Sequence, residues 1–284
     1  MLIRKGDVGL VTGASRGLGV VIAEALAARG MNLVLAARSH DDLEAVRLRL
    51  ETRYRIEAIA VAVDLDDEAA LAALVDAALQ RFGHLDLLVN NAGVDHPLRF
   101  DAVNPADIRR VLSINLTAPM LLARLCLPHM QRAGRGHIVN IASVAGLMSS
   151  AYEELYVAAK HGLVGFTRAL RLSAQELRWQ VSASVICPGF MDGAGVYERM
   201  KLEHRVKAPA AMGSMSAQRL GRCVIECVER DRADAVLMRG APRLVAALQV
   251  LLPGLYELIC KWLDTSAPFR TVASANMTNQ SRSQ

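Results

Sequence analysis

The chain has 284 residues, of which 52% are hydrophobic and only 4% are aromatic. This length allows one large or two small domains, and a core of Ala, Leu and Val suits short parallel strands buried between two helical layers. The net charge of +5 fits an anionic small ligand or a weak attraction to membranes. The Lys and Arg residues are scattered without interleaved aromatic residues, which argues against nucleic-acid binding.

The five cysteines are an odd number and include no Cys-x-x-Cys pair. This pattern argues against a disulfide framework and predicts a reduced, cytoplasmic location. Cys223 and Cys227 share a helix face, but no His or Cys cluster joins them, so we expect no metal site. The first residues contain no apolar run long enough for a signal peptide, and we expect none.

Apolar strand-like runs alternate with longer helical patterns, as in βα units around a parallel sheet. The expected strands are 8–12, 32–37, 58–63, 85–90, 137–142, 181–186 and a short 235–238. The expected helices are 17–29, 41–53, 68–82, 105–132, 153–177, 216–230 and 243–263. Because no linker interrupts the chain earlier, we predict one domain over 1–264 and a polar, mobile tail over 265–284.

A glycine-rich segment stands at the turn from the first strand to the first helix and reads Thr12-Gly13-Ala14-Ser15-Arg16-Gly17-Leu18-Gly19. Glycines there permit a tight turn and the close approach of a pyrophosphate to N–H groups at the helix N-terminus. The spacing is Gly-x-x-x-Gly-x-Gly rather than the Gly-x-Gly-x-x-Gly of long-chain dehydrogenases. The segment therefore predicts a dinucleotide site, although a purely structural turn is the alternative.

The end of the second strand carries Arg38 and Ser39, where an acidic residue would be expected to bind a free ribose 2′-hydroxyl. Together with Arg16 in the glycine turn, Arg38 suits a 2′-phosphate, because guanidinium groups pair well with phosphate oxygens. We therefore predict NADP(H) in preference to NAD(H). The alternative is that Arg38 is a solvated loop charge.

Tyr156 and Lys160 are four residues apart in an expected helix, and Ser143 directly follows the expected strand 137–142. Residues at this spacing share a helix face, so the ammonium can stabilise the phenolate and lower the phenol pKa from its usual value of about 10. Ser143 stands where ligands of open α/β sheets bind. The three residues predict a site that exchanges a proton with a carbonyl or alcohol oxygen, and nearby Tyr152 is read as a pocket wall.

These motifs, in this order, resemble the short-chain dehydrogenase/reductase family over about residues 7–240. The motifs that carry the resemblance are Thr12–Gly19, Asp64-Leu65, Asn90-Asn91-Ala92-Gly93, Asn115, Ser143, Tyr156 with Lys160, and Pro188-Gly189. The resemblance implies a Rossmann-type, doubly wound parallel sheet of about seven strands with helices on both faces. It also implies that Gly13, Ser15, Arg16, Gly17, Leu18 and Gly19 bind the cofactor, together with Arg38, Ser39, Asp64, Leu65, Asn91, Ala92, Gly93, Tyr156, Lys160, Pro188 and Gly189.

By the same resemblance Tyr156 is the acid in reduction and the base in oxidation, Lys160 binds the nicotinamide ribose, and Ser143 orients the substrate oxygen. Asp64 and Leu65 would contact the adenine, and Asn91 to Gly93 the ribose and nicotinamide side, whereas Asn90 would brace the sheet. Pro188-Gly189 would form the loop over the nicotinamide. Many relatives carry a Thr where this chain has Gly193. With further glycines at 189 and 195, we expect this segment to be a mobile lid.

Asn115 lies inside the expected helix 105–132, for which Asn104 is the expected N-cap. Pro119 has no N–H to donate to the Asn115 carbonyl, so the helix should kink there. The freed carbonyl could hold a water that links Lys160 to solvent, as the family's proton relay requires. The alternative is a kinked packing helix.

The apolar segment 244–263 is interrupted by Pro253-Gly254 and carries Gln249, Glu257 and Lys261, which are costly in lipid. We expect two short helices that cover the substrate mouth or a partner, with an in-plane membrane helix as the alternative. An adaptable apolar pocket is expected from Phe190, Met191, Tyr197, Met200 and Met212.

The leading hypothesis is an NADP(H)-dependent oxidoreductase that interconverts a carbonyl and an alcohol on a small, lipophilic substrate. A catalytically silent nucleotide-binding regulatory protein and a membrane-surface, lipid-modifying reductase are the alternatives. The resemblance favours a homodimer or homotetramer formed through the helices 105–132 and 153–177. The expected location is the cytoplasm, with peripheral membrane contact through 244–263 as the alternative.

Overall fold

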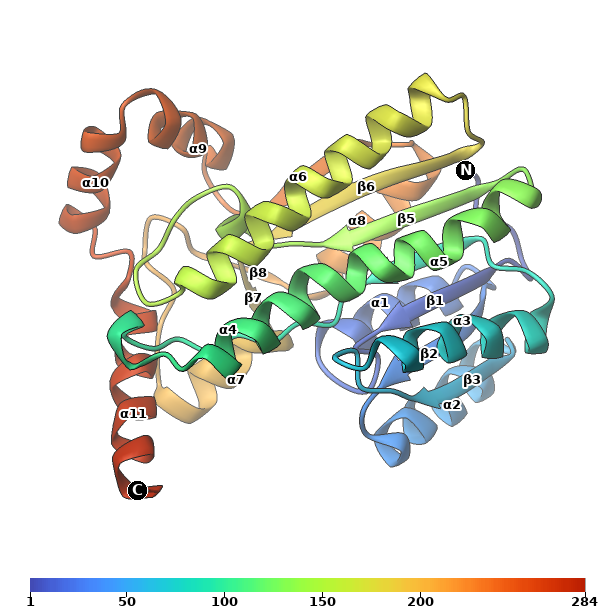
Figure 1. The fold of residues 1–284 in the computed structure, drawn as a ribbon, viewed down its shortest axis with the longest axis horizontal. Helices are drawn as coiled ribbons and strands as arrows, with labels where there is room; N and C mark the ends of the chain where they lie inside the picture. The colour runs from blue at the N-terminus through green and yellow to red at the C-terminus, as the bar shows by residue number, and fades with distance from the viewer. Residues whose placement is uncertain (284) are drawn as a thin grey trace.

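The computed structural model describes residues 1–283, with the side chains of residues 1–278. Its main sheet has seven parallel strands in the order β3-β2-β1-β4-β5-β6-β9 (Figure 1). The strands are β1 Val8–Thr12, β2 Asn32–Ala37, β3 Ala58–Ala62, β4 Leu87–Asn90, β5 Gly136–Ile141, β6 Val181–Pro188 and β9 Asp234–Leu237. The predicted doubly wound parallel sheet is confirmed, and each strand begins and ends within two residues of its expected bounds.

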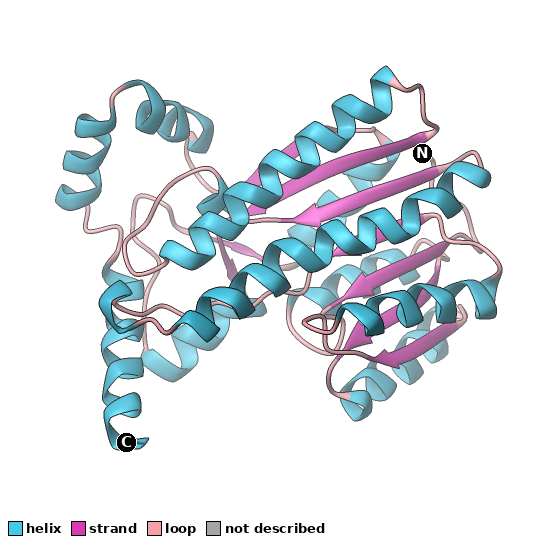
Figure 2. Cartoon of the chain, viewed as in Figure 1, coloured by secondary structure: helices cyan, strands magenta, loops and turns pink. Residues whose placement is uncertain are grey.

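Helices cover both faces of this sheet (Figure 2). One buried cluster joins the sheet to α1 Leu18–Ala27, α2 His40–Tyr54 and α8 Gln218–Glu229. A second cluster joins the other face to α3 Glu68–Phe82, α5 Ala118–Arg132 and α6 Glu154–Glu176. The central strands β1, β4 and β5 are buried throughout because helices cover both of their faces, whereas the edge strands β3 and β9 are only partly buried.

The strand order reverses between β1 and β4, which are hydrogen-bonded neighbours. Loops leave the carboxyl ends of these two strands in opposite directions, and such a point is where open α/β sheets bind ligands. The glycine-rich turn follows β1, and residues 91–93 follow β4. The topology therefore brings two segments of the predicted dinucleotide site to the same edge of the sheet.

The expected helix 105–132 is divided into α4 Pro105–Leu112, a π-helical turn Ser113–Thr117 and α5. Asn104 caps α4 as predicted, since its side chain accepts a hydrogen bond of 2.9 Å from the Asp107 N–H. The expected kink takes the form of the π-helical turn, which begins two residues before Asn115. The distortion follows from Pro119, which removes the α-helical donor to the Asn115 carbonyl.

The chain beyond β6 contains elements that the sequence patterns did not indicate. A short strand, β7 Phe190–Asp192, pairs with β8 Ser214–Ser216, and α7 Gly195–His204 lies between them. Two short 3-10 helices, Phe100–Ala102 and Val144–Gly146, precede this region. The expected mobile lid is therefore a strand followed by a helix.

The apolar segment near the C-terminus forms two short helices, as expected. They are α9 Pro242–Leu251 and α10 Pro253–Trp262, with Leu252 between them. Within the segment expected to be a polar, mobile tail, 265–284, Ala267–Ser283 forms a helix, α11. Val272 and Ala273 of this helix are buried, so apolar contacts hold it; Gln284 lies outside the described residues. Figure 1 places α9 to α11 beyond the carboxyl ends of the strands.

Candidate active site

Tyr156, Lys160 and Ser143 meet at the carboxyl end of β5. Tyr156 and Lys160 are one turn apart on α6, and the Lys160 Nζ lies 5.4 Å from the centre of the Tyr156 ring. The Lys160 ammonium donates a hydrogen bond of 3.0 Å to the Ile141 carbonyl, at the last residue of β5. Ser143 and Tyr156 line the same cavity, and the Ser143 hydroxyl lies near enough to the Tyr156 phenol to act on its pKa. The structure thus brings together the three side chains that the sequence pattern singled out.

The electrostatic environment of this group differs from the expectation. Burial raises the pKa of the Tyr156 phenol, and the nearby carboxyl groups of Asp95 and Glu153 raise it further, whereas the Ser143 hydroxyl acts in the lowering direction. The expected lowering of the phenol pKa is therefore wrong for this state of the protein. Burial lowers the pKa of the Lys160 ammonium to about 8. A phenol with a raised pKa remains protonated, which suits a proton donor.

The Ser143 side chain is held in place by two hydrogen bonds to backbone groups. Its hydroxyl accepts a hydrogen bond of 3.1 Å from the Ala145 N–H and donates one of 3.4 Å to the Pro188 carbonyl. Gly189 in turn donates from its N–H to the Leu237 carbonyl of the edge strand β9, at 2.9 Å. The loop at 188–189 is thereby fixed between Ser143 and the end of β9.

Asn115 is fully buried and close to Lys160. Its side-chain amide donates to the Val94 and Val111 carbonyls at 2.7 and 3.0 Å, and its Oδ1 accepts from the Val94 N–H at 3.2 Å. A Cβ atom on Gly93 would lie 2.7 Å from the Asn115 Oδ1 and 3.6 Å from the Lys160 Nζ. The π-helical turn therefore positions the loop after β4 against the ammonium, and the proton relay through the Asn115 carbonyl stays a prediction.

The glycine-rich turn is as tight as its sequence predicts. Gly13 and Gly17 have φ angles of +67° and +63°, a region that favours glycine. A Cβ atom on Gly19 would lie 2.0 Å from the Gly13 carbonyl oxygen. Gly17 caps α1, so the N–H groups of the first helical turn are left for a ligand. Glycine is thus required at these positions, and the turn fits a pyrophosphate.

Thr12, the first residue of the glycine-rich segment, has a bracing role that its sequence position alone did not assign. Its hydroxyl accepts hydrogen bonds from the N–H groups of Asn91 and Ala92, both at 3.0 Å, and the Asn91 amide donates to the Thr12 carbonyl at 2.9 Å. The signal for this role in the sequence is a hydroxyl side chain at the end of a buried strand, directly before the glycine turn. Asn90 braces the sheet as expected, since its amide donates to the Asn140 Oδ1 at 2.8 Å.

The tips of β2 and β3 carry the residues expected to contact the adenosine half of a cofactor. Ala14 in the glycine turn donates to the Ala36 carbonyl at 3.2 Å, and Val63 donates to the Ala37 carbonyl at 2.8 Å. These bonds hold three loops side by side. The loops carry Ser15 and Arg16, Arg38 and Ser39, and Asp64 and Leu65. Ser39 also caps α2 by accepting from the Asp42 N–H.

Arg16 and Arg38 are both exposed. Within the described chain, neither guanidinium has an ion-pair or hydrogen-bond partner. Two guanidinium groups without a partner at one loop cluster could receive an anionic group such as a 2′-phosphate. The acidic residues Asp41 and Asp42 lie in the first turn of α2, as expected from the helix dipole.

A cavity of about 260 Å³ opens beside Ser143 and Tyr156. Four of the five residues expected to form an apolar pocket line it, namely Phe190, Tyr197, Met200 and Met212. Met191 does not, because side chains alternate along β7 and its side chain is buried in the core. Tyr152, expected as a wall residue, is also outside the lining and adopts a φ of +70°.

The C-terminal helices complete the cavity wall. Side chains of α9, α10 and α11, and of the segment between α10 and α11, line the cavity. They are Val245, Leu248, Tyr256, Ile259, Cys260, Leu263, Thr265 and Phe269. Phe269 stacks on Phe190 with the ring centres 6.1 Å apart, and the Tyr256 hydroxyl donates to the Ser149 carbonyl at 2.7 Å. These helices thus cover the substrate side of the site, which was one of the two expectations for them.

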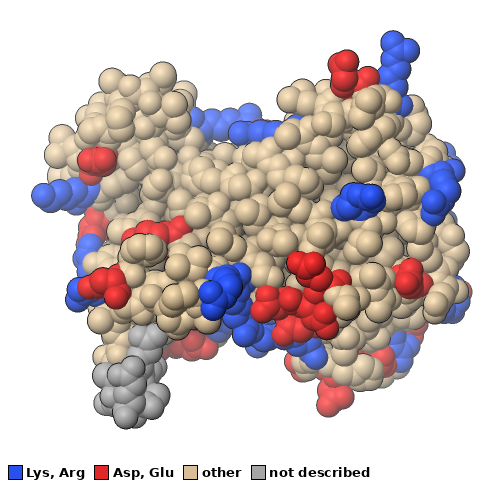
Figure 3. Space-filling view, viewed as in Figure 1, with Lys and Arg blue, Asp and Glu red and all other residues tan. Residues whose placement is uncertain are grey.

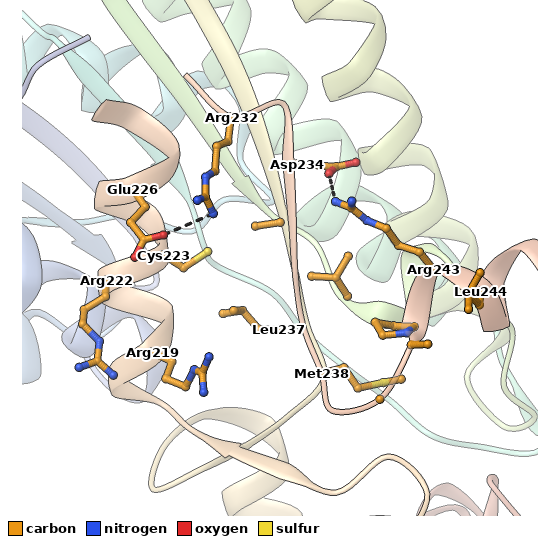
Figure 4. Close-up of a pocket in the computed structure, with 15 residues that line it drawn as sticks. Arg219, Arg222, Cys223, Glu226, Arg232, Asp234, Leu237, Met238, Arg243 and Leu244 are labelled. Atoms are coloured by element: carbon orange, nitrogen blue, oxygen red, sulfur yellow. Dashed lines mark hydrogen bonds and ion pairs between the residues drawn. The ribbon is translucent and has the colours of Figure 1, made fainter. Parts of the chain in front are cut away.

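A second, larger hollow of about 670 Å³ lies between α8 and the segment from β9 to α9 (Figure 4). Four arginines line it, Arg219, Arg222, Arg232 and Arg243. Two of them are neutralised, since Arg232 pairs with Glu226 at 3.3 Å and Arg243 pairs with Asp234. None of the predicted site residues borders this hollow.

Comparisons with known proteins agree with this geometry. Residues 7–203 match the family model of the short chain dehydrogenases. The ketoacyl reductase HetN of Nostoc sp. is 34% identical over 90% of this chain and 89% of its own length. The NAD(+)-dependent 15-hydroxyprostaglandin dehydrogenase of Rattus norvegicus is 34% identical over 82% of this chain and 90% of its own length. The crystal structure of a metagenomic short-chain oxidoreductase in complex with NADP superimposes with a TM-score of 0.70 and 31% identity, covering 82% of this chain and 97% of that one. This chain belongs to the short-chain dehydrogenase/reductase family.

Proposed function

We propose that this chain is an NADP(H)-dependent oxidoreductase that interconverts a carbonyl and an alcohol on a lipophilic substrate. One observation carries the proposal: Tyr156 and Ser143 line the wall of one cavity together, with the Lys160 ammonium 5.4 Å from the centre of the phenol ring. A nicotinamide dinucleotide, when bound, would supply or accept the hydride. The glycine turn and the loop at 91–93 would hold it.

In reduction, the Ser143 hydroxyl donates a hydrogen bond to the substrate oxygen and fixes its position. The Tyr156 phenol, kept protonated by its raised pKa, gives its proton to that oxygen as negative charge develops there. Lys160 stabilises the phenolate that results and binds the ribose of the cofactor. Asn115 passes the replacement proton from solvent toward Lys160 through a water on its carbonyl. Oxidation runs the same steps in reverse.

Two observations support the proposed cofactor and substrate. Arg16 and Arg38 are exposed at the tips of adjacent loops, where a 2′-phosphate would lie beside the ribose of the cofactor. The relatives described above include one that uses NAD(+) and a structure that contains NADP, so the preference for NADP(H) rests on these arginines. The aromatic, methionine and aliphatic side chains around the cavity favour an apolar substrate.

The test is an assay of NADPH oxidation with acyl thioesters, steroids, quinones and long-chain aldehydes. We expect turnover of at least one of these lipophilic classes, and lower turnover when NADH replaces NADPH. If NADPH binds but no class is reduced, the chain is the catalytically silent nucleotide-binding protein instead. Calorimetric measurement of NADPH binding in parallel separates these two outcomes.

A contact with membrane surfaces is a second proposal, favoured by the outer side of α9 and α10. Leu244, Val250, Leu251, Leu258 and Trp262 there are 63–82% exposed, and Figure 3 shows mostly uncharged atoms on this lobe, with isolated acidic and basic side chains at its outer edge. Each helix has ten residues, which is too short to span a bilayer but sufficient to lie in its surface. A cytoplasmic enzyme of this kind could collect a lipophilic substrate from the membrane.

We also propose a homodimer or homotetramer formed through α5 and α6. Exposed apolar side chains on these helices, Met120 at 40% and Leu172 at 66%, support this surface. Sedimentation velocity with Leu172→Glu would test it, because a charge in the interface should shift the protein to monomer. An unchanged sedimentation coefficient would exclude α6 as the contact.

A further inference from the structure

Two carboxyl groups stand beside the proposed proton donor, and the mechanism above does not use them. Asp95 lies in the loop after β4, and Glu153 directly precedes α6, three residues before Tyr156. The two carboxyl groups lie close enough to shift each other's pKa, and two carboxyl groups at hydrogen-bonding distance share a proton. Both line the cavity that Ser143 and Tyr156 border. The wall of the cavity, which also includes the cation Arg239 and the Ser149 and Thr265 hydroxyls, thus contains an acid pair on the same side-chain lining as Tyr156.

The pair has an unmet capacity for hydrogen bonding. Glu153 is only 5% exposed, and the Asp95 Oδ1 is buried without a partner among the described residues. Burial raises the pKa of both carboxyl groups, and the charge of Asp95 raises the pKa of Glu153 further. A buried acceptor without a partner is unfavourable unless a ligand satisfies it. Asp95 therefore offers an acceptor for a donor group on the bound substrate.

The groups around the pair define its charge. Arg199 on α7 and the neighbouring His96 favour the ionised form of Asp95, whereas Glu154 opposes ionisation of Glu153. Asp95 also acts on Lys160, whose ammonium it favours, and both carboxyl groups raise the pKa of Tyr156. With one shared proton the pair carries a single negative charge, so it attracts a cation or a neutral donor and repels a carboxylate.

The loop that carries Asp95 is fixed on both sides. Asn115 binds the N–H and the carbonyl of Val94, as described above. Leu98 donates from its N–H to the Tyr152 carbonyl at 3.1 Å, and the Asn276 amide of α11 donates to the Pro97 carbonyl at 2.9 Å. The segment once expected to be a mobile tail therefore helps to hold the carboxyl pair in position.

We infer that Asp95 and Glu153 form a polar anchor for a hydrogen-bond donor, an amino or hydroxyl group, that the lipophilic substrate carries close to its reacting carbonyl. The inference rests on the proposed function, because it names the substrate class for the same cavity. It assigns Asp95 and Glu153 to substrate specificity. The preferred substrates are then amino- or hydroxy-substituted ketones with an apolar chain, and fatty carboxylates are excluded.

The test measures binding, which does not depend on turnover. Calorimetric titrations of the wild type with decylamine, decan-1-ol and decanoate compare three head groups on one alkyl chain. The variants Asp95→Asn and Glu153→Gln keep the shape of each side chain and remove its charge, while Glu154→Gln makes the same change at the exposed neighbouring residue. Thermal melts of each variant confirm that it is folded.

We expect decylamine to bind the wild type at least tenfold more tightly than decanoate, with decan-1-ol between them. Asp95→Asn and Glu153→Gln should each weaken decylamine at least tenfold, whereas Glu154→Gln should leave it within twofold. Decylamine affinity should rise with pH as the pair loses its protons. Equal binding of decylamine and decanoate by the wild type overturns the inference, as does an unchanged decylamine affinity in both folded variants.

The failure of the anchor and the failure of the proposed function have different signatures. Head-group selectivity that depends on Asp95, in a protein that reduces no carbonyl, supports the anchor and contradicts the enzyme. Turnover of plain long-chain ketones without any head-group selectivity supports the enzyme and contradicts the anchor.

Discussion

Lys160 is the residue whose ionisation should be visible in the kinetics. Burial lowers its pKa to about 8 from the ordinary Lys value, so the ammonium is present below this pH and is lost as the pH rises through it. The raised pKa of Tyr156 keeps the phenol protonated over the same range. The value of kcat/KM for carbonyl reduction should therefore fall above pH 8. A profile for reduction that stays flat to well above pH 9 would contradict this role of Lys160.

Arg38 should decide the preference between the two cofactors. Its guanidinium is exposed and, among the described residues, has no partner, so its removal costs the fold little. A hydrogen bond to a charged group contributes about 1.5–3 kcal/mol, so Arg38→Ala should raise the Kd for NADPH roughly tenfold to a hundredfold. The Kd for NADH should change little, because NADH lacks the 2′-phosphate.

Arg219→Ala is the matched control, since Arg219 lines the separate hollow beside α8. It should leave both dissociation constants unchanged. An equal loss of NADPH binding in the two variants would show that general charge, and not a 2′-phosphate contact, attracts the cofactor.

At the scale of elements, the glycine turn gives a stability prediction. Because a Cβ atom on Gly19 would lie 2.0 Å from a backbone oxygen, Gly19→Ala must displace the start of α1. We expect the free energy of unfolding to fall by about 4 kcal/mol, which is near the upper end for single substitutions. The Tm should drop accordingly. NADPH should no longer bind measurably.

Gly165 provides the contrast, because it lies in α6 and no atom lies within 4 Å of its Cβ position. Gly165→Ala should stabilise the protein by about 0.5–1 kcal/mol, since alanine favours the helix. Differential scanning calorimetry of both variants checks the pair. A Gly19→Ala protein with the wild-type Tm would contradict the described turn.

The elements that could be predicted from sequence are those whose residues carry a local signal. The strands of the main sheet are uninterrupted apolar runs, and Asn104 or Asp67 marks a helix start by its side chain. Helix α11 could not be predicted, because its polar sequence has few buried residues and is held by Phe269, Val272 and Asn276 on distant parts of the chain. Strands β7 and β8 likewise depend on each other, although residues 193–213 separate them in the chain.

The site residues divide in the same way into those with a local sequence signal and those without one. Ser143, Tyr156 and Lys160 could be named because their spacing on a strand end and a helix face is itself the signal. Asp95 and Glu153 could not, because acidic residues in loops are ordinarily solvated, and only the fold brings these two into contact within a cavity.

At the scale of the whole molecule, the outer side of α9 and α10 presents an exposed apolar surface. If this surface contacts membranes, the wild type should float with phospholipid vesicles in a density gradient. Leu258→Glu combined with Trp262→Glu should abolish flotation, because each charged side chain replaces apolar contact worth about 1.5–3 kcal/mol. Both native side chains are more than 60% exposed, so the fold should tolerate the change.

Leu48→Glu on α2 is the control, since Leu48 is likewise exposed at 54% but lies far from this surface in the sequence and on another helix. It should float as the wild type does. A wild-type protein that stays at the bottom of the gradient would exclude the membrane contact.

The account depends most on Tyr156 as the group that exchanges a proton with the substrate oxygen, and its removal is the most direct test. The kcat for the best carbonyl substrate should be measured for Tyr156→Phe. Tyr54→Phe is the control, because Tyr54 lies on α2 outside the cavity and the variant loses the same hydroxyl group. We expect Tyr156→Phe to lower kcat by about 10²–10⁴-fold with unchanged NADPH binding, and Tyr54→Phe to keep wild-type kcat. A Tyr156→Phe enzyme that retains wild-type kcat would contradict the account.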